Sequence, residues 1–357
     1  MVVDISELLE KLVTQGGSDL HISSNLPPAI RVDGKLKRLD YPPLSAEDVE
    51  NLLFPMLSNE QRRRLEQEWE LDFSYGLEGL SRFRVNFYKD KGNYAAAFRT
   101  ITSQVPSFEK LGLPDIVRTT AEKPRGLILV TGPTGSGKST TLAAMIDYIN
   151  TTKAEHILTI EDPIEFVHTS KSSIIHQREL GMDTRSFANA LKSALREDPD
   201  IILVGEMRDH ETIALALTAA ETGHLVFGTL HTSSASQTID RIIDVFPEGQ
   251  QQQIRVQLAN SLQAVFSQTL LPKVQPDGTK KGRVMAQEIM LVTPAIANLI
   301  REAKAAQIYS TIQMNQGMGM QTLEMALANL YKQNLITLED ALSKTSRPDE
   351  LKRMINV

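Results

Sequence analysis

The sequence predicts an α/β protein in which a smaller α+β domain precedes a larger domain built on a parallel sheet. At about 150 residues per domain, its 357 residues predict two domains. The chain has 41% hydrophobic and 23% charged residues, close to the average for globular proteins, so it can form packed cores. From Gly126 onward, apolar strand-like runs alternate with helix-like segments, which is typical of sheets with helical crossovers.

The first predicted domain spans residues 1–101 and mixes helices with short strands. Asp4 can cap a helix whose apolar residues fall on one face, and Gly16 and Gly17 end it. A polar helix is predicted over residues 45–67. Stretches rich in strand-forming residues, separated by turns, predict strands over 19–22, 29–32, 71–75, 81–88 and 94–101.

We expect a linker over residues 102–125, which are rich in proline, serine and charge. The second predicted domain spans residues 126–357. Its apolar runs predict buried parallel strands, and they are Leu127–Val130, His156–Ile160, Ile201–Val204 and Leu225–Leu230.

The region after Pro247 is predicted to be mainly helical, because apolar residues recur every four positions from Ile254 to Leu270. Residues 274–282 predict a polar hairpin or loop. Thr293 and Pro294 then predict the start of another helix.

Composition excludes several classes of protein. The chain has no cysteine, which excludes disulfides, thiolate zinc sites and cysteine nucleophiles. Its 38 basic and 44 acidic residues give a net charge of −6, which argues against general nucleic-acid binding. Every apolar stretch is shorter than the ~20 residues of a membrane span, and the acidic start lacks the pattern of a signal peptide. We therefore expect a cytoplasmic protein without nucleic-acid partners or direct membrane insertion.

A phosphate-binding pattern, G-x-x-x-x-G-K-[ST], lies between an apolar run and a helix predicted to begin near Thr140. Its glycines let successive backbone N–H groups face one concavity, and the helix N-terminus adds partial positive charge. Lys138 would reach the β- and γ-phosphates, and the Ser139 hydroxyl would ligate Mg²⁺. The predicted phosphate-site residues are Gly132, Pro133, Thr134, Gly135, Ser136, Gly137, Lys138, Ser139 and Thr140.

A second strand end carries a candidate catalytic carboxylate. The run Ile201–Val204 leads into Gly205 and Glu206, and ligands gather at the carboxyl ends of parallel strands. Glu206 is the candidate to orient or deprotonate an attacking water; the alternative is a solvated loop glutamate. Because Gly205 stands where a magnesium-ligating aspartate is usual, metal contacts would come from Ser139, water and another acidic segment.

The sequence TIEDPIE, residues 159–165, supplies such an acidic segment, and Pro163 would end its strand. Acidic loops are common, so a purely solvated segment stays an alternative. His231 follows the run Leu225–Leu230 and would either sense the phosphate or satisfy a buried hydrogen bond. His224 is the weaker candidate because it lies near a turn.

Together these segments resemble the motifs of the secretion ATPase superfamily. The phosphate-binding pattern resembles its Walker A motif, TIEDPIE its Asp box, LREDPDIILVGEMRD its Walker B motif and AAETGHLVFGTLHT its His box. Three further segments resemble the pilus retraction branch of the superfamily, and they are SDLHIS, SRFRVNFY with AAFRTI, and GRVMAQEIMLVTPAIANLIRE.

The resemblance implies a PAS-like N-terminal domain, a RecA-like ATPase domain, and a homohexameric ring that binds ATP and Mg²⁺. It implies catalytic roles for Glu206, Glu161 and His231, and metal contacts from Ser139 and Asp162. Arginines of the first domain would approach the phosphates and stabilise their charge; the positions implied are Arg84 and Arg99, with Arg82 a weaker match. The alternative for each arginine is a strand residue with its charge in solvent.

Within the superfamily, the resemblance implies a motor that drives type IV pilus retraction and twitching. Its partners would be an inner-membrane platform protein at the pilus base and a paralogous motor ATPase. The short chain without cysteine favours retraction over assembly and secretion motors, which usually carry a further domain and a four-cysteine insert. Residues 295–302 match the retraction signature AIRNLIRE except at Ala297, so an accessory retraction motor stays an alternative.

Three other function classes fit the sequence less well. A GTP switch would show the guanine-recognition pattern N-K-x-D, which the chain lacks. A small-molecule kinase would have no need of a 100-residue first domain bearing these arginines. A nucleotide-binding scaffold without turnover would have no need of Lys138, Ser139 and Glu206 together.

Overall fold

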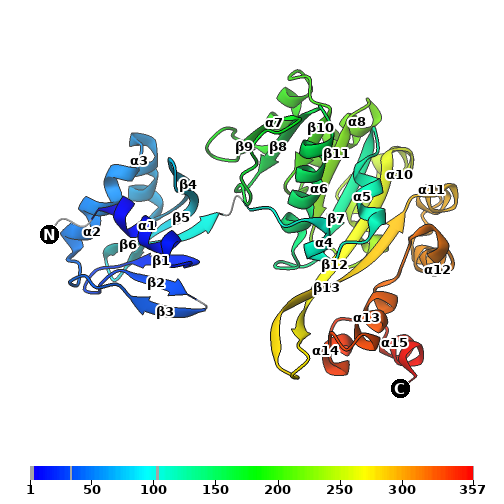
Figure 1. The fold of residues 1–357 in the computed structure, drawn as a ribbon. Coiled ribbons are helices and arrows are strands. Elements are labelled where there is room, and N and C mark those ends of the chain that lie inside the picture. Colours follow the sequence, from blue (N-terminus) through cyan, green and yellow to red (C-terminus); the bar gives the residue numbers. More distant parts are fainter. Residues whose placement is uncertain (1–3, 33, 102–103, 357) are drawn as a thin grey trace. The chain divides into compact units, whose positions relative to one another are not determined.

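The computed structural model describes residues 4–32, 34–101 and 104–356. The chain forms two compact units (Figure 1). Unit 1 comprises Met1–Gln104 with Pro163–Val167, and unit 2 comprises Val105–Asp162 with His168–Val357. The predicted α/β class, with an α+β unit before a parallel-sheet unit, is confirmed.

Unit 1 is an antiparallel six-stranded sheet with three α-helices packed on one face. The strand order is β3-β2-β1-β6-β5-β4. Its strands are β1 (Asp19–Ile22), β2 (Ala29–Val32), β3 (Lys35–Arg38), β4 (Glu70–Leu77), β5 (Ser81–Asp90) and β6 (Asn93–Ile101). Its helices are α1 (Ile5–Thr14), α2 (Ala46–Leu53) and α3 (Asn59–Glu68), with a 3-10 turn η1 (Phe54–Met56) before α3.

The local signals explain where these helices begin and end. Asp4 caps α1 as predicted, its side chain accepting a hydrogen bond from the Ser6 amide. The single helix expected over 45–67 is wrong in detail, because Pro55 lacks an amide proton and divides the segment. Ser45 and Ser58 each form a capping box, so each of the two helices begins at its own N-cap.

Unit 2 is built on a seven-stranded sheet with the order β13-β12-β7-β11-β10-β8-β9. All neighbouring strands are parallel except β12 and β13. The strands are β7 (Gly126–Thr131), β8 (His156–Glu161), β9 (Ile174–Glu179), β10 (Ile201–Val204), β11 (Leu225–Leu230), β12 (Leu262–Val274) and β13 (Lys280–Leu291). All four predicted strands are present.

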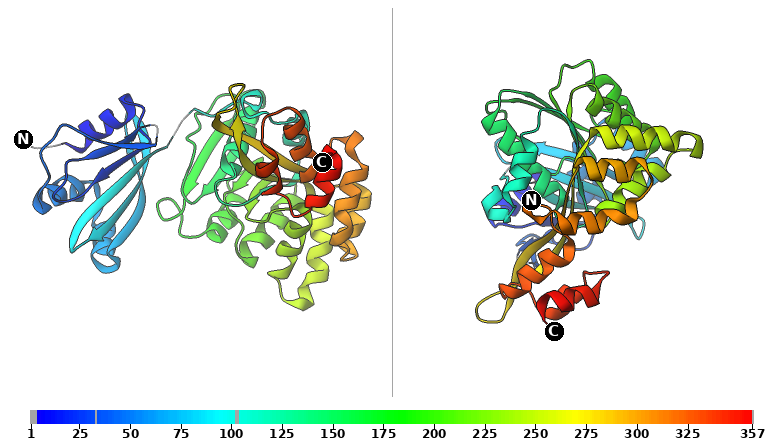
Figure 2. Two further views of the ribbon diagram at one scale, coloured as in Figure 1. Left: turned by 90° about the horizontal axis from the view of Figure 1, so that it is seen from below. Right: turned by 90° about the vertical axis from the view of Figure 1, so that its right-hand side faces the viewer.

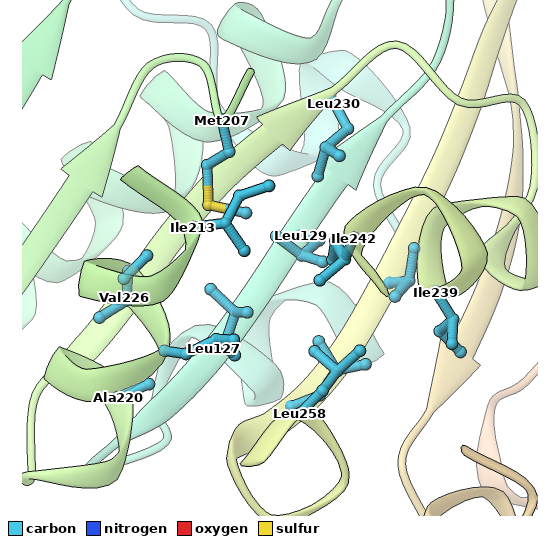
Figure 3. Packing of buried hydrophobic residues seen from close by; sticks show 14 of the residues in the cluster. Leu127, Leu129, Met207, Ile213, Ala220, Val226, Leu230, Ile239, Ile242 and Leu258 are labelled. Atoms are coloured by element: carbon cyan, nitrogen blue, oxygen red, sulfur yellow. The ribbon is translucent and has the colours of Figure 1, made fainter. Parts of the chain in front are cut away.

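Two buried cores cover the two faces of this sheet. Side chains alternate between faces along a strand, so Leu127 and Leu129 of β7 lie in one core, shown in Figure 3, and Ile128 and Val130 lie in the other. The first core includes α7 (Phe187–Ala194), α8 (His210–Glu221), α9 (Ala235–Asp244) and α10 (Glu248–Ser261). The second includes α6 (Lys138–Thr152).

The expected linker over 102–125 is largely folded. Residues 102–103 lie outside the described part of the chain, and the following segment forms α4 (Phe108–Leu111) and α5 (Asp115–Ala121). Phe108 and Val117 are buried in the second core of unit 2 beside residues of α6. The polar composition was misleading because only one side of these short helices needs to be apolar.

The mainly helical region expected after Pro247 is wrong between residues 262 and 291. Helix α10 ends at Ser261, and the chain continues as the antiparallel pair β12–β13. The repeat of four in Ile254–Leu270 misled the prediction, because four residues are also two repeats of a strand. The predicted hairpin near 274–282 is the turn of this pair.

Helices do follow the hairpin. They are α11 (Pro294–Arg301), α12 (Ile308–Met314), α13 (Leu323–Lys332), α14 (Leu338–Leu342) and α15 (Pro348–Ile355), with short 3-10 turns η2 (Ala305–Gln307) and η3 (Gln316–Met318). Figure 2 shows α13 and α15 beside the base of the β12–β13 hairpin, and a small core including Leu271, Leu327 and Leu351 joins them. No helix in the described residues is long and apolar enough to cross a membrane.

Candidate active site

The phosphate-binding pattern forms a tight loop between β7 and α6. Its glycines have conformations that other residues rarely adopt: φ is +142° at Gly132, +79° at Gly135 and +87° at Gly137, which is the N-cap of α6. At Gly132 there is also no space for a side chain, since an added Cβ would lie 2.2 Å from the backbone carbonyl oxygen of Gln268. The loop therefore needs these glycines for its shape.

Lys138, the first residue of α6, lies against this loop. Its Nζ donates hydrogen bonds to the carbonyl oxygens of Gly132 at 2.9 Å and Pro133 at 3.2 Å. It also lies 3.4 Å from Nδ1 of His231. The ammonium charge thus stands beside a helix N-terminus that is itself partly positive, an arrangement that attracts phosphate.

Glu206 lies two strands away from the phosphate loop, at the carboxyl end of β10. It follows β10, and His231 follows β11, the strand between β10 and β7. Oε1 of Glu206 lies 2.9 Å from Nε2 of His231, which joins Lys138, His231 and Glu206 in one chain of contacts. Parallel strand order has brought three predicted site residues together.

Arg208 also holds Glu206. Its Nε lies 2.5 Å from Oε1, and its Nη2 donates to Oε2 at 2.6 Å, so the guanidinium binds both carboxylate oxygens. Burial acts to raise the pKa of Glu206, but hydrogen bonding and charge from Arg208, with a contribution from His231, hold it below the ordinary value. Glu206 is therefore ionised at neutral pH, as a base must be.

The predicted acidic segment follows β8. Glu161 is the last residue of that strand, and its Oε1 accepts hydrogen bonds from Thr159 at 2.7 Å and Gln177 at 3.1 Å. Asp162 is exposed and lies close enough to Arg208 to favour the charged guanidinium. These contacts hold Glu161 in place at the same edge of the sheet as Glu206.

Ser139 and Asp162 fit an Mg²⁺ ion that would be held mainly by the phosphates of a bound nucleotide. Within the described ranges, no group of three or more His, Cys, Asp or Glu side chains could hold a metal ion. Mg²⁺ usually keeps several waters and takes one or two protein ligands with substrate phosphates. The Ser139 hydroxyl in the first turn of α6, with Asp162 as a second candidate, suits that mode.

Arg84 and Arg99 lie together in unit 1. They face each other in register across β5 and β6, and both are exposed on the face of the sheet opposite the helices. Arg99 Nε lies 3.0 Å from Oδ1 of Asp19, its register partner on β1. Like charges directly opposite each other are unfavourable; Asp19 offsets part of the charge on Arg99, and the pair remains a candidate contact for an anion. Arg82, one strand repeat from Arg84, is half-buried.

Two residues of the site were not predicted from the sequence, and one predicted candidate lies away from the site. Arg208 could have been suspected from its charge two residues after Glu206. Gln268, which contacts the phosphate loop, lay in a segment predicted to be helical. His224 precedes β11 and so lies at the opposite edge of the sheet from His231; its Nδ1 lies 3.0 Å from the Ala219 carbonyl oxygen.

Known proteins resemble this chain over nearly its full length. The family model described as type II/IV secretion system protein matches residues 1–343. The type IV pilus retractation ATPase PilT of Pseudomonas aeruginosa is 56% identical over 97% of this chain and 99% of its own. The type IV pilus ATPase PilU of the same organism is 39% identical over 99% of this chain and 92% of its own. The crystal structure of the pilus retraction motor PilT with bound ADP superposes with a TM-score of 0.91, at 52% identity, over 98% of this chain and 99% of that one.

Proposed function

The chain belongs to the type II/IV secretion system protein family, and we propose that it is a motor ATPase that powers type IV pilus retraction. One observation carries the catalytic part. The contacts from Lys138 through His231 to Glu206 join a phosphate-binding cation and a carboxylate base across three neighbouring strand ends. No acceptor other than water is needed for that pair to cleave a triphosphate.

In this scheme the chain's own residues bind the nucleotide, orient the attacking water and remove its proton. The loop amides and Lys138 hold the β- and γ-phosphates of ATP. The Ser139 hydroxyl would hold Mg²⁺, which when bound neutralises phosphate charge. Glu206 accepts a proton from water as the water oxygen bonds to the γ-phosphorus. The bond from that phosphorus to the bridging oxygen breaks, leaving ADP and phosphate.

We expect a homohexamer in which Arg84 and Arg99 stabilise the charge on the transferred phosphoryl group. The work of the ring would be applied to an inner-membrane platform protein at the pilus base. We accordingly propose a cytoplasmic protein that associates peripherally with the inner membrane. Pilus disassembly and twitching motility would be the outcome in the cell.

A retraction motor is favoured over an accessory motor by identity, which is 56% to PilT and 39% to PilU. One residue favours the accessory function. Ala297, where the retraction signature has arginine, is buried on α11 and packs in the first core of unit 2. This chain therefore lacks the positive charge of the retraction signature at position 297, and the alanine there is part of the hydrophobic core.

The test of catalysis is Glu206→Gln, which keeps the shape of the side chain and removes the base. We expect ATP turnover to fall ~10²-fold or more while ADP binding is retained. Glu221→Gln is the matched control, since Glu221 ends α8 at the other edge of the sheet and contacts Gln257. Turnover unchanged in Glu206→Gln would remove Glu206 from the scheme.

The test of retraction is deletion of the gene followed by complementation, scoring surface pili and twitching. Hyperpiliated, non-motile cells would support retraction by this protein itself. Bald cells would identify an assembly motor. Normal motility would indicate an accessory function.

A further inference from the structure

A buried glutamine on β12 holds the phosphate-binding loop from behind. Nε2 of Gln268 donates a hydrogen bond to the carbonyl oxygen of Ser136 at 2.9 Å. Its Oε1 accepts from the Thr141 hydroxyl, in the first turn of α6, at 3.0 Å. Gln268, Ser136 and Thr141 are each at most 3% exposed. These bonds join a strand and a loop that are 132 residues apart in the sequence.

The partners determine the orientation of the Gln268 carboxamide. A carbonyl oxygen only accepts, so the atom facing Ser136 must be the NH₂ group. The atom facing Thr141 is then the oxygen, and it also lies 3.3 Å from Nε2 of Gln287, the register partner of Gln268 on β13. A carboxylate at this position would place an acceptor against the Ser136 carbonyl.

The bond to Ser136 sets the direction of the next amide. A trans peptide is planar, with its C=O and N–H pointing in opposite directions. Because the Ser136 carbonyl points at Gln268, the Gly137 N–H points away from it. In loops of this type the backbone N–H groups bind the phosphates.

The loop's own hydrogen bond here runs from the Ser136 N–H to the Pro133 carbonyl oxygen at 3.1 Å, so it restrains the peptide before Ser136 and not the Ser136–Gly137 peptide. Gly135 and Gly137 flank Ser136, both at positive φ, and glycine rotates more freely than any other residue. The Ser136 hydroxyl oxygen is buried and has no hydrogen-bond partner in the described part of the chain. The carboxamide of Gln268 therefore provides the tertiary restraint on the Ser136–Gly137 peptide.

We propose that Gln268 is a positioning residue for nucleotide binding, which aligns the Gly137 amide with a phosphate of the bound nucleotide. The inference rests on the proposed function, because it assumes that this loop binds ATP. It assigns Gln268 no contact with the reacting atoms. Its effect should therefore appear in nucleotide affinity more than in the rate of the chemical step.

The test compares Gln268→Met, Gln268→Glu and the control Gln287→Met in the full-length protein. Methionine keeps the length of the side chain and removes its polar atoms. Leaving the buried Ser136 carbonyl unpaired and its peptide free should raise the ADP Kd and the ATP KM about tenfold. The kcat at saturating ATP should stay within about threefold of wild type, since the base and the lysine are unchanged. Gln268→Glu should weaken binding further.

Gln287→Met is the matched control, because Gln287 is equally buried and its replacement leaves Gln268 bonded to both Ser136 and Thr141, losing only the longer contact at 3.3 Å. We expect its ADP Kd, measured by calorimetry, to stay close to that of wild type. An unchanged ADP Kd in Gln268→Met and Gln268→Glu would overturn the proposal. So would an equal loss in Gln287→Met, since the effect would then belong to core packing.

Should both Gln268 variants fail to fold, Thr141→Val removes one of the bonds that orient the carboxamide while keeping the shape of the side chain. A raised ADP Kd in this variant would support the proposal, and an unchanged Kd would overturn it. If wild-type protein neither binds ADP nor hydrolyses ATP, the proposed function itself fails. If wild type does both and the variants bind ADP normally, only the role of Gln268 fails.

Discussion

Glu288 should make the stability of unit 2 fall as pH rises. This carboxyl on β13 is 4% exposed and accepts a hydrogen bond from the Ala235 amide, at the start of α9, at 2.7 Å. Burial raises its pKa from the ordinary 4.5 to about 7; the nearby Glu324 also raises it, while Ala235 and Arg347 oppose the shift. Glu288 therefore keeps its proton in the folded protein at pH values where the unfolded chain releases it.

The sign and size of the change in the free energy of unfolding follow from the difference between the pKa of Glu288 in the folded and unfolded states. Between pH 4.5 and about 7 the folded state binds more protons than the unfolded state, so the free energy of unfolding falls as pH rises. At about 1.4 kcal/mol per tenfold change in proton affinity, the total loss is about 3 kcal/mol. The stabilisation is complete below pH 4.5 and is lost as pH rises through about 7.

Glu288→Gln removes this dependence, because glutamine can still accept from Ala235 but has no proton to release. Thermal unfolding followed by calorimetry at pH 5, 6, 7 and 8 would measure the effect. About 2.5 kcal/mol of the loss falls between pH 5 and 8, so for a unit of this size the Tm of the variant relative to wild type should rise by about 5–10 °C over that range. Glu302→Gln is the control, since the exposed Glu302 pairs with Lys304 and has a lowered pKa. Parallel Tm curves for wild type and Glu288→Gln would refute the reasoning.

Three further predictions concern the candidate active site. Arg208→Ala should let the pKa of Glu206 rise, moving the acid limb of the pH–rate profile to higher pH, and an unmoved limb would show that Arg208 has no such influence. Arg84→Ala and Arg99→Ala should each lower ATP turnover ~10²-fold in a steady-state assay, and wild-type rates in both would exclude these arginines from catalysis. Gly132→Ala should abolish ADP binding measured by calorimetry, because its Cβ would lie 2.2 Å from the Gln268 carbonyl oxygen, and normal affinity would contradict the loop geometry.

The phosphate-binding loop could be predicted from sequence because its chemistry lies within eight consecutive residues. Gly132, Gly137 and Lys138 define its shape and charge locally, and the apolar run before them and the helix after them complete the unit. The strand ends that carry Glu206 and His231 were predictable for a similar reason. Each comes after a short, mainly apolar run of the kind that forms buried strands of a parallel sheet, and every residue of both runs is buried.

The β12–β13 hairpin could not be predicted from the same kind of signal. Apolar residues four apart fit one face of a helix and equally one face of a strand. Only pairing decides between them, and β12 pairs with β7 on one side and β13 on the other. The helices α4 and α5 were missed because their burial depends on α6, which follows them in the chain.

By itself the sequence determined the family, the phosphate loop and the strand segments that lead into the site. The tertiary structure alone decided that Arg208 binds both oxygens of Glu206, that Gln268 supports Ser136, and that Glu288 is buried at the start of α9. The physical reason is that a local motif needs only neighbouring residues. A hydrogen bond between distant segments exists only once strand order and register have brought its donor and acceptor within 3 Å.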